Sequence, residues 1–102
     1  MGLTEKWHKQ KLTKEDIKAW VKDQWQAKGL TEDETDHVVR CMFSIFLSYH
    51  SEYELGHFLT AVVENDFGKA CGRADKINLK ALGLYALFLF NVAPMDYKAK
   101  IL

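Results

Sequence analysis

The sequence predicts an all-α protein that forms a single compact domain over residues 1–102. Apolar residues recur at spacings of three and four along most of the chain. No segment alternates apolar and polar residues, and no Asn-Gly or Asp-Gly hairpin turn occurs. The apolar content of 48% in 102 residues suits one domain that folds without disulfides. We expect about five helices in an orthogonal or bundle-like arrangement, over residues 14–28, 32–50, 52–64, 67–73 and 76–91, with 1–12 and 95–102 as loose ends.

The first predicted helix begins after Thr13, which is a favourable N-cap. Glu15 and Asp16 stand in its first turn, where the helix dipole favours negative charge. Its apolar stripe has the spacing of one helical face and consists of Ile17, Trp20, Val21 and Trp25. We expect Gly29 to end this helix in the left-handed conformation.

Capping-box patterns predict the start of the next two helices, with Thr31 followed by Glu34 and Ser51 followed by Glu54. The second helix runs to about His50 and is apolar on most sides, so we expect it to be central. The third helix carries one clean apolar stripe, formed by Leu55, Phe58, Leu59, Val62 and Val63.

Short polar segments separate the last two predicted helices. Asn65 or Asp66 ends the third helix and caps a short fourth one, and Asp75 caps the last helix. The last helix is apolar on nearly every side and ends by Asn91 and Pro94. Because a small domain encloses two such helices with difficulty, we expect the last one to be either the centre of the bundle or part of a homodimer contact.

A cluster of polar residues lies where these helices join, and it comprises Glu64, Asn65, Asp66, Arg73, Asp75 and Asn78. One interpretation is a polar notch that binds a ligand or a partner's side chain. The other is structural, with two helix caps and an ion pair from Arg73 to Glu64 or Asp66. An Arg–carboxylate pair is geometrically specific without being catalytic. We favour the structural interpretation.

Patterns typical of enzymes and metal sites are missing from the sequence. No two of the four histidines have the i, i+4 spacing of zinc ligands on one helix. Cys41 and Cys71 stand among apolar residues, without the positive charge that activates a thiol. We therefore expect a protein that is not an enzyme and that has no metal and no cofactor.

Targeting signals are also missing. The first 28 residues are polar and lysine-rich, unlike a secretory signal. The most apolar run, residues 81–90, is shorter than the roughly 20 residues that span a bilayer. The expected location is cytoplasmic.

Charge is distributed unevenly although the net charge is zero. Residues 1–30 and 67–102 are basic, whereas residues 31–66 hold eight acidic residues and Arg40 as the one base. The densest acidic patch comprises Glu32, Asp33, Glu34 and Asp36. Helix-dipole complementarity explains most of this patch, and the alternative is a negative surface for a basic partner.

Tryptophan and lysine are concentrated near the N-terminus. Trp7 precedes the first predicted helix and joins no apolar stripe, so we expect it to be an exposed anchor for a partner. Lysines interleaved with all three tryptophans fit a nucleic-acid-binding segment. That segment lacks arginine, the side chain that most often reads bases.

Residues 56–94, "GHFLTAVVENDFGKACGRADKINLKALGLYALFLFNVAP", resemble a family of small proteins of bacteriophages and other mobile elements. The matching residues are Gly56, Phe58, Leu59, Ala61, Val62, Asn65, Asp66, Gly72, Arg73, Ala74, Asp75, Asn78, Ala81, Leu82, Asn91, Ala93 and Pro94. His57, Val63 and Phe67 depart from the family's pattern. The resemblance implies a phage or mobile-element origin, and it implies no particular activity.

Together these features lead us to expect a small non-catalytic phage protein that binds a host or phage protein or nucleoprotein complex. An inhibitor of host defence such as an anti-CRISPR protein, acting in the cytoplasm of the bacterial host, is one example. The expected contact residues are Trp7, Glu32, Asp33, Glu34 and Asp36. The alternatives are a DNA- or RNA-binding regulator that uses the lysine- and tryptophan-rich segment, and a structural homo-oligomer.

Overall fold

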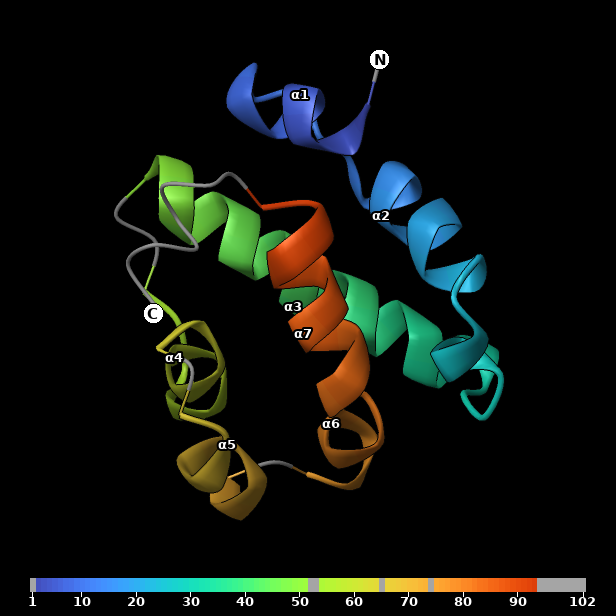
Figure 1. The fold of residues 1–102 in the computed structure, drawn as a ribbon, viewed down its shortest axis with the longest axis vertical. Coiled ribbons are helices and arrows are strands. Elements are labelled where there is room, and N and C mark those ends of the chain that lie inside the picture. The colour runs from blue at the N-terminus through green and yellow to red at the C-terminus, as the bar shows by residue number, and fades with distance from the viewer. Residues whose placement is uncertain (1, 52–53, 65, 74, 94–102) are drawn as a thin grey trace.

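The computed structural model describes residues 2–51, 54–64, 66–73 and 75–93, and within these residues it contains helices and no strand. The elements are α1 (Leu3–His8), α2 (Lys14–Lys22), the 3-10 helix η1 (Trp25–Ala27), α3 (Glu32–His50), α4 (His57–Val63), α5 (Phe67–Arg73), α6 (Lys76–Lys80) and α7 (Leu82–Asn91). In Figure 1, α3 crosses behind α7, with α1 and α2 on one side and α4 and α5 on the other. The prediction of an all-α fold is confirmed.

The predicted starts of α2 and α3 are confirmed by the capping boxes that the structure contains. The Thr13 hydroxyl accepts a hydrogen bond from the Asp16 N–H at 3.1 Å, and the Asp16 carboxylate accepts one from the Thr13 N–H at 3.1 Å. In the second box, the Thr31 hydroxyl accepts from the Glu34 N–H at 3.1 Å, and the Glu34 carboxylate accepts from the Thr31 N–H at 2.9 Å. These bonds satisfy N–H groups that the helix itself leaves without acceptors. The predicted centrality of α3 is also confirmed by its fully buried core residues Val38, Met42 and Ile45.

The N-terminal segment is ordered into α1, so the prediction of a loose end over residues 1–12 is wrong. Trp7 has an exposed fraction of 0%, and its ring lies 5.3 Å from Phe46 and 5.8 Å from Phe88, measured between centroids. The Thr4 hydroxyl donates to the carbonyl of Val92 at 2.9 Å. Burial of an aromatic side chain of this size supplies enough free energy to dock a six-residue helix that is too short to be stable alone.

A Schellman motif ends α1. The N–H of Lys11 donates to the carbonyl of Lys6 at 2.8 Å, and the N–H of Gln10 donates to that of Trp7 at 3.1 Å. The motif requires a left-handed residue, and Gln10 occupies that position with a φ of 57°. A residue with a Cβ is strained there, and this turn brings Leu12 back onto the core.

The predicted helix over 14–28 is two elements instead of one. α2 ends at Lys22, Gln24 is extended, and η1 follows. The Gln24 side-chain amide donates to the carbonyl of Trp20 at 3.1 Å, and the N–H of Asp23 donates to the same carbonyl at 3.2 Å. The break lets Ala27 and Leu30 pack against the core. The prediction that Gly29 is left-handed is wrong, because no described glycine has a positive φ.

α4 begins at His57, with Gly56 as its N-cap, and not at residue 52. Ser51 ends α3, and its hydroxyl donates to the carbonyl of Leu47 at 2.7 Å. The predicted capping box with Glu54 is wrong because residues 54–56 are not helical. Residues 52 and 53 lie outside the described part of the chain. A serine after a long helix can bond backward as well as forward, and the sequence pattern does not distinguish the two.

The last part of the chain confirms two predicted caps and corrects one helix. The Asp66 carboxylate accepts from the N–H of Lys69 at 3.1 Å, and that of Asp75 accepts from the N–H of Asn78 at 2.8 Å. The fourth predicted helix matches α5. The predicted helix over 76–91 is interrupted at Ala81, which separates α6 from α7. The predicted loose end over 95–102 lies outside the described residues.

No helix within the described residues is both long and apolar enough to cross a bilayer.

Candidate functional site

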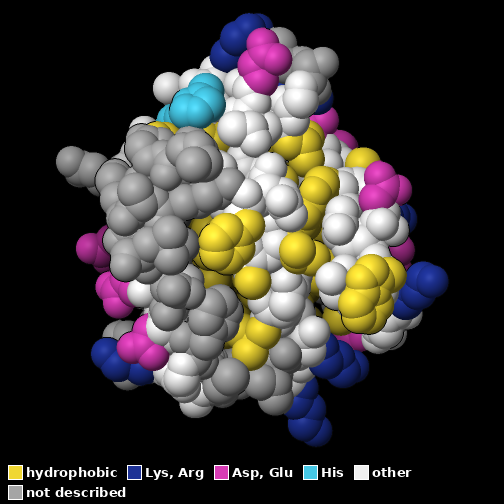
Figure 2. Space-filling model, viewed as in Figure 1, with side chains coloured by type: hydrophobic (Ala, Val, Ile, Leu, Met, Phe, Trp, Pro, Cys, Tyr) yellow, Lys and Arg dark blue, Asp and Glu magenta, His cyan; other side chains and the backbone are white. Residues whose placement is uncertain are grey.

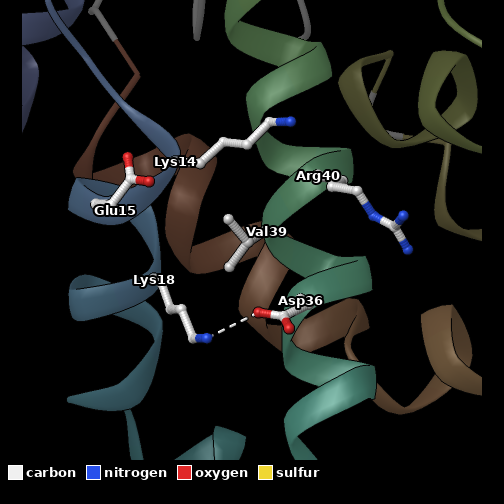
Figure 3. A pocket seen from close by; sticks show the side chains of 6 residues that line it. All are labelled: Lys14, Glu15, Lys18, Asp36, Val39 and Arg40. Carbon is white, nitrogen blue, oxygen red and sulfur yellow. Dashed lines mark ion pairs between the residues drawn. The ribbon is translucent and has the colours of Figure 1, made fainter.

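The acidic start of α3 faces the lysines of α2 in a group of ion pairs that we call the charged seam, formed by Lys18, Lys22, Glu32 and Asp36. The Lys18 ammonium lies 2.6 Å from a carboxylate oxygen of Glu32 and 2.9 Å from one of Asp36. Lys22 lies 3.5 Å from the same Glu32 oxygen. Figure 3 shows Lys18 reaching across from α2 to Asp36.

The ion pairs favour the charged forms of Lys18, Glu32 and Asp36. Hydrogen bonds from Lys18 lower the pKa values of Glu32 and Asp36, and the two carboxylates raise the pKa of Lys18. The pKa of Glu34 is lowered first by the backbone N–H of Thr31 and then by Lys80, whose ammonium lies 3.2 Å away. Three of the four acids predicted to contact a partner, Glu32, Glu34 and Asp36, are therefore ion-paired with lysines of the same chain. Asp33 is exposed and forms no ion pair with a described residue.

Two open hollows of about 380 Å³ each flank the charged seam. The first lies between α2 and α3, has Val39 among its lining residues and carries Lys14, Glu15 and Arg40 around it (Figure 3). The Lys14 ammonium stands 5.5 Å from the ring centroid of Phe43, a cation–π contact that holds it against α3. Because both cationic and carboxylate side chains line this hollow, its wall does not carry charge of a single sign.

The second hollow is formed by the end of α2, η1 and the start of α3. We call it the Trp25 surface, and its lining includes Lys22, Asp23, Trp25, Lys28, Leu30 and Glu32. Trp25 has an exposed fraction of 72%, the highest among the large hydrophobic side chains that the structure describes. Because the chain breaks between α2 and η1, Trp25 does not continue the apolar stripe of α2, in which Ile17 and Val21 are buried.

The predicted anchor Trp7 is not at the surface, and this prediction is wrong. Its ring is enclosed by aromatic side chains of α3 and α7, and its carbonyl lies 2.6 Å from the Nε2 atom of His50. In the fold, the strongly exposed tryptophan is Trp25 instead. A sequence signal for the burial of Trp7 existed in the i, i+4 pair with Leu3, which also packs against the core.

The polar cluster at the helix junction is only partly within the described side chains. Asp66 and Asp75 act as the caps described above, and Glu64 is exposed at the end of α4. Asn78 is buried, and its side-chain oxygen accepts a hydrogen bond from the Tyr85 hydroxyl at 2.6 Å. Asn65 and the side chain of Arg73 lie outside the described part, and so does the predicted ion pair of Arg73.

Two residues of α3, His37 and Cys41, also lie at this junction. Their position there was not predicted from the sequence. The Nε2 atom of His37 lies 3.8 Å from the Cys41 sulfur and 3.8 Å from an Asp75 carboxylate oxygen. The i, i+4 spacing of His37 and Cys41 was the available signal. Burial raises the pKa values of Cys41 and Tyr85, so the thiol is held in its neutral form.

The lysine-rich N-terminal segment is also partly neutralised. Lys6 pairs with Asp16 at 2.8 Å, and its hydrogen bond lowers the pKa of that carboxylate. Lys9 pairs with Glu5 at 3.1 Å.

Among the described residues, no group of three or more histidine, cysteine, aspartate or glutamate side chains is placed to hold a metal ion.

Comparison of the chain with protein-family models, with curated proteins and with solved structures gives no significant match.

Proposed function

We propose that this protein is a non-catalytic binding protein of phage or mobile-element type that binds another protein through the Trp25 surface. The observation that carries the proposal is the 72% exposure of Trp25 beside an open hollow of about 380 Å³. An exposed tryptophan ring leaves a large apolar area in water, and binding a partner removes that area.

The composition of the Trp25 surface favours a protein partner. Tryptophan is enriched among the few residues that contribute most of the free energy of protein–protein binding, and a polar rim commonly surrounds it. Here Lys22, Lys28, Asp23 and Glu32 supply a rim of both charges. A rim of mixed sign matches a protein surface of mixed sign.

Nucleic-acid binding is less well supported. Of the seven lysines in residues 1–30 that suggested it, four are engaged in ion pairs, namely Lys6, Lys9, Lys18 and Lys22. Each such pair must be broken, or must share its charge, before the lysine neutralises a phosphate. Of the three tryptophans, Trp7 is buried, and Trp20 packs against Phe88 with ring centroids 5.8 Å apart.

The resemblance of residues 56–94 to phage and mobile-element proteins directs the search for the partner. A host or phage protein complex is the class to test first, and the CRISPR–Cas complexes of host defence belong to it. The contact residues that we now propose are Trp25 with Lys28 and Asp33, in place of Trp7 and the ion-paired acids.

The experiment is a quantitative pull-down from lysate of a bacterial host, with the full chain and two variants. Trp25→Ala is expected to reduce recovery of a stoichiometric partner at least about tenfold, the effect of losing an interface hot spot. Phe90→Ala, which truncates an aromatic side chain that is 52% exposed, is the matched control and is expected to leave recovery nearly unchanged.

Three results would contradict the proposal. They are recovery of no stoichiometric partner by the full chain, an equal loss with both variants, and retention of nucleic acid whose binding weakens steeply as salt is raised. The last result would favour the alternative of a DNA- or RNA-binding regulator.

A further inference from the structure

α1 is held to the rest of the protein mainly through one face. Trp7 is fully buried beside the rings of Phe46 and Phe88, and the Thr4 hydroxyl donates to the carbonyl of Val92 at 2.9 Å. The other side of α1 is in water, since Figure 2 shows lysine, acidic and histidine side chains at the top of the molecule, where α1 lies in Figure 1. Because this helix has only six residues, it is not stable without its contacts to the core.

The connection from α1 to the buried Leu12 is exposed over its whole length. Residues 8–11 are all exposed, and among them Gln10 has the left-handed φ of 57°. A residue with a Cβ is strained in this conformation, and the strain is released when the turn opens. Leu12 and the capping box of α2 fix the chain beyond this segment. The segment can therefore act as a hinge about which α1 moves while α2 stays in place.

The contacts of α1 with its neighbours can be lost without loss of the neighbours' own structure. Lys6 pairs with Asp16 at 2.8 Å, yet Asp16 also bonds to Thr13 in the capping box of α2 and keeps those bonds when Lys6 leaves. The Nε2 atom of His50, the last residue of α3, lies 2.6 Å from the carbonyl of Trp7. Both contacts reach α2 and α3 through side chains, so these helices keep their backbone hydrogen bonds when α1 detaches.

We propose that α1 is a strap that opens as one unit about Gln10 while the helices from α2 to α7 stay folded. Release of Trp7 uncovers an aromatic slot between α3 and α7, formed by the rings of Phe46, Tyr49 and Phe88. This opening costs less free energy than global unfolding, because it exposes one large side chain and its close neighbours and leaves most of the core buried. The proposal is independent of the proposed function.

Native-state hydrogen exchange of the full chain, followed residue by residue by NMR, tests the proposal. The N–H groups of Lys6, Lys9, Gln10 and Lys11 all donate to backbone carbonyls of the same segment. They are expected to share one protection factor, at least about 100-fold smaller than that of the Met42 amide in the middle of α3. Protection that rises gradually from the N-terminus, which is fraying, or protection equal to that of Met42, which is global unfolding, would overturn the proposal.

Two variants separate the opening of α1 from global unfolding. Tyr85→Phe removes the hydrogen bond to Asn78 near the α6 end of α7, which in Figure 1 is opposite to the end near α1. It is expected to lower the protection of Met42 about tenfold and to leave that of α1 unchanged. Gln10→Gly, which removes the strain of the closed turn, should raise the protection of α1 about two- to fivefold. Equal losses in α1 and α3 with the first variant, or no gain in α1 with the second, would overturn the proposal.

Discussion

Replacing Trp7 with alanine is expected to cost the protein a large part of its stability. Trp7 has an exposed fraction of 0%, and its ring lies within 5.8 Å of those of Phe46, Tyr49 and Phe88. Truncation of a buried tryptophan to alanine costs about 3–5 kcal/mol, since burial is lost and a cavity remains. A domain of this size has a free energy of unfolding of about 5–15 kcal/mol. The midpoint of thermal unfolding should fall by more than about 12 °C.

Urea denaturation followed by circular dichroism measures this loss, with Trp25→Ala as the matched control. Trp25 is 72% exposed, and its replacement should change the free energy of unfolding by less than about 0.5 kcal/mol. An unchanged slope with urea would show that the variant still unfolds as one unit. The reasoning fails if Trp7→Ala costs less than about 1 kcal/mol, or if the two variants cost the same.

Three further predictions concern local features of the fold. Gln10→Gly should raise the free energy of unfolding by about 0.5–1 kcal/mol, because glycine adopts the left-handed conformation without strain, and a thermal melt that shows no gain would contradict this. Tyr85→Phe should cost about 1–3 kcal/mol in urea denaturation, because the buried oxygen of Asn78 loses its donor, and a neutral effect would mean that the 2.6 Å bond contributes nothing. Stability should decline as pH falls below about 4.5, since the pKa values of Glu32 and Glu34 lie below their ordinary value of 4.5 and the unfolded chain therefore binds more protons there. Urea midpoints that stay constant from about pH 6 to pH 3 would contradict the last prediction.

The ion pairs formed by the acidic residues at the start of α3 change how the charge pattern of the sequence should be interpreted. Residues 31–66 are strongly acidic in sequence, yet Lys18 and Lys22 of α2 and Lys80 of α6 face the start of α3. The segments of opposite charge are brought together in the fold. An uneven charge distribution along a chain is therefore weak evidence for a charged surface on the molecule, because packing places complementary segments side by side.

The sequence by itself determined the features that depend on residues a few positions apart. The capping boxes of Thr13 and Thr31, the caps at Asp66 and Asp75, and the central position of the apolar helix α3 all follow from local hydrogen bonding and from the helical period. These signals predicted an all-α fold and most of its helices.

Only the tertiary structure decided which tryptophan is buried and which acids are free. Trp7 of the first helix meets Phe88 of the last, and Lys80 meets Glu34 across 46 positions of the chain. Whether a side chain becomes a core residue or an exposed anchor depends on what the fold places against it. Such contacts carry no period and no spacing, so the same Trp7 that looked unpartnered in sequence is enclosed, and the break after α2 turned Trp25 outward.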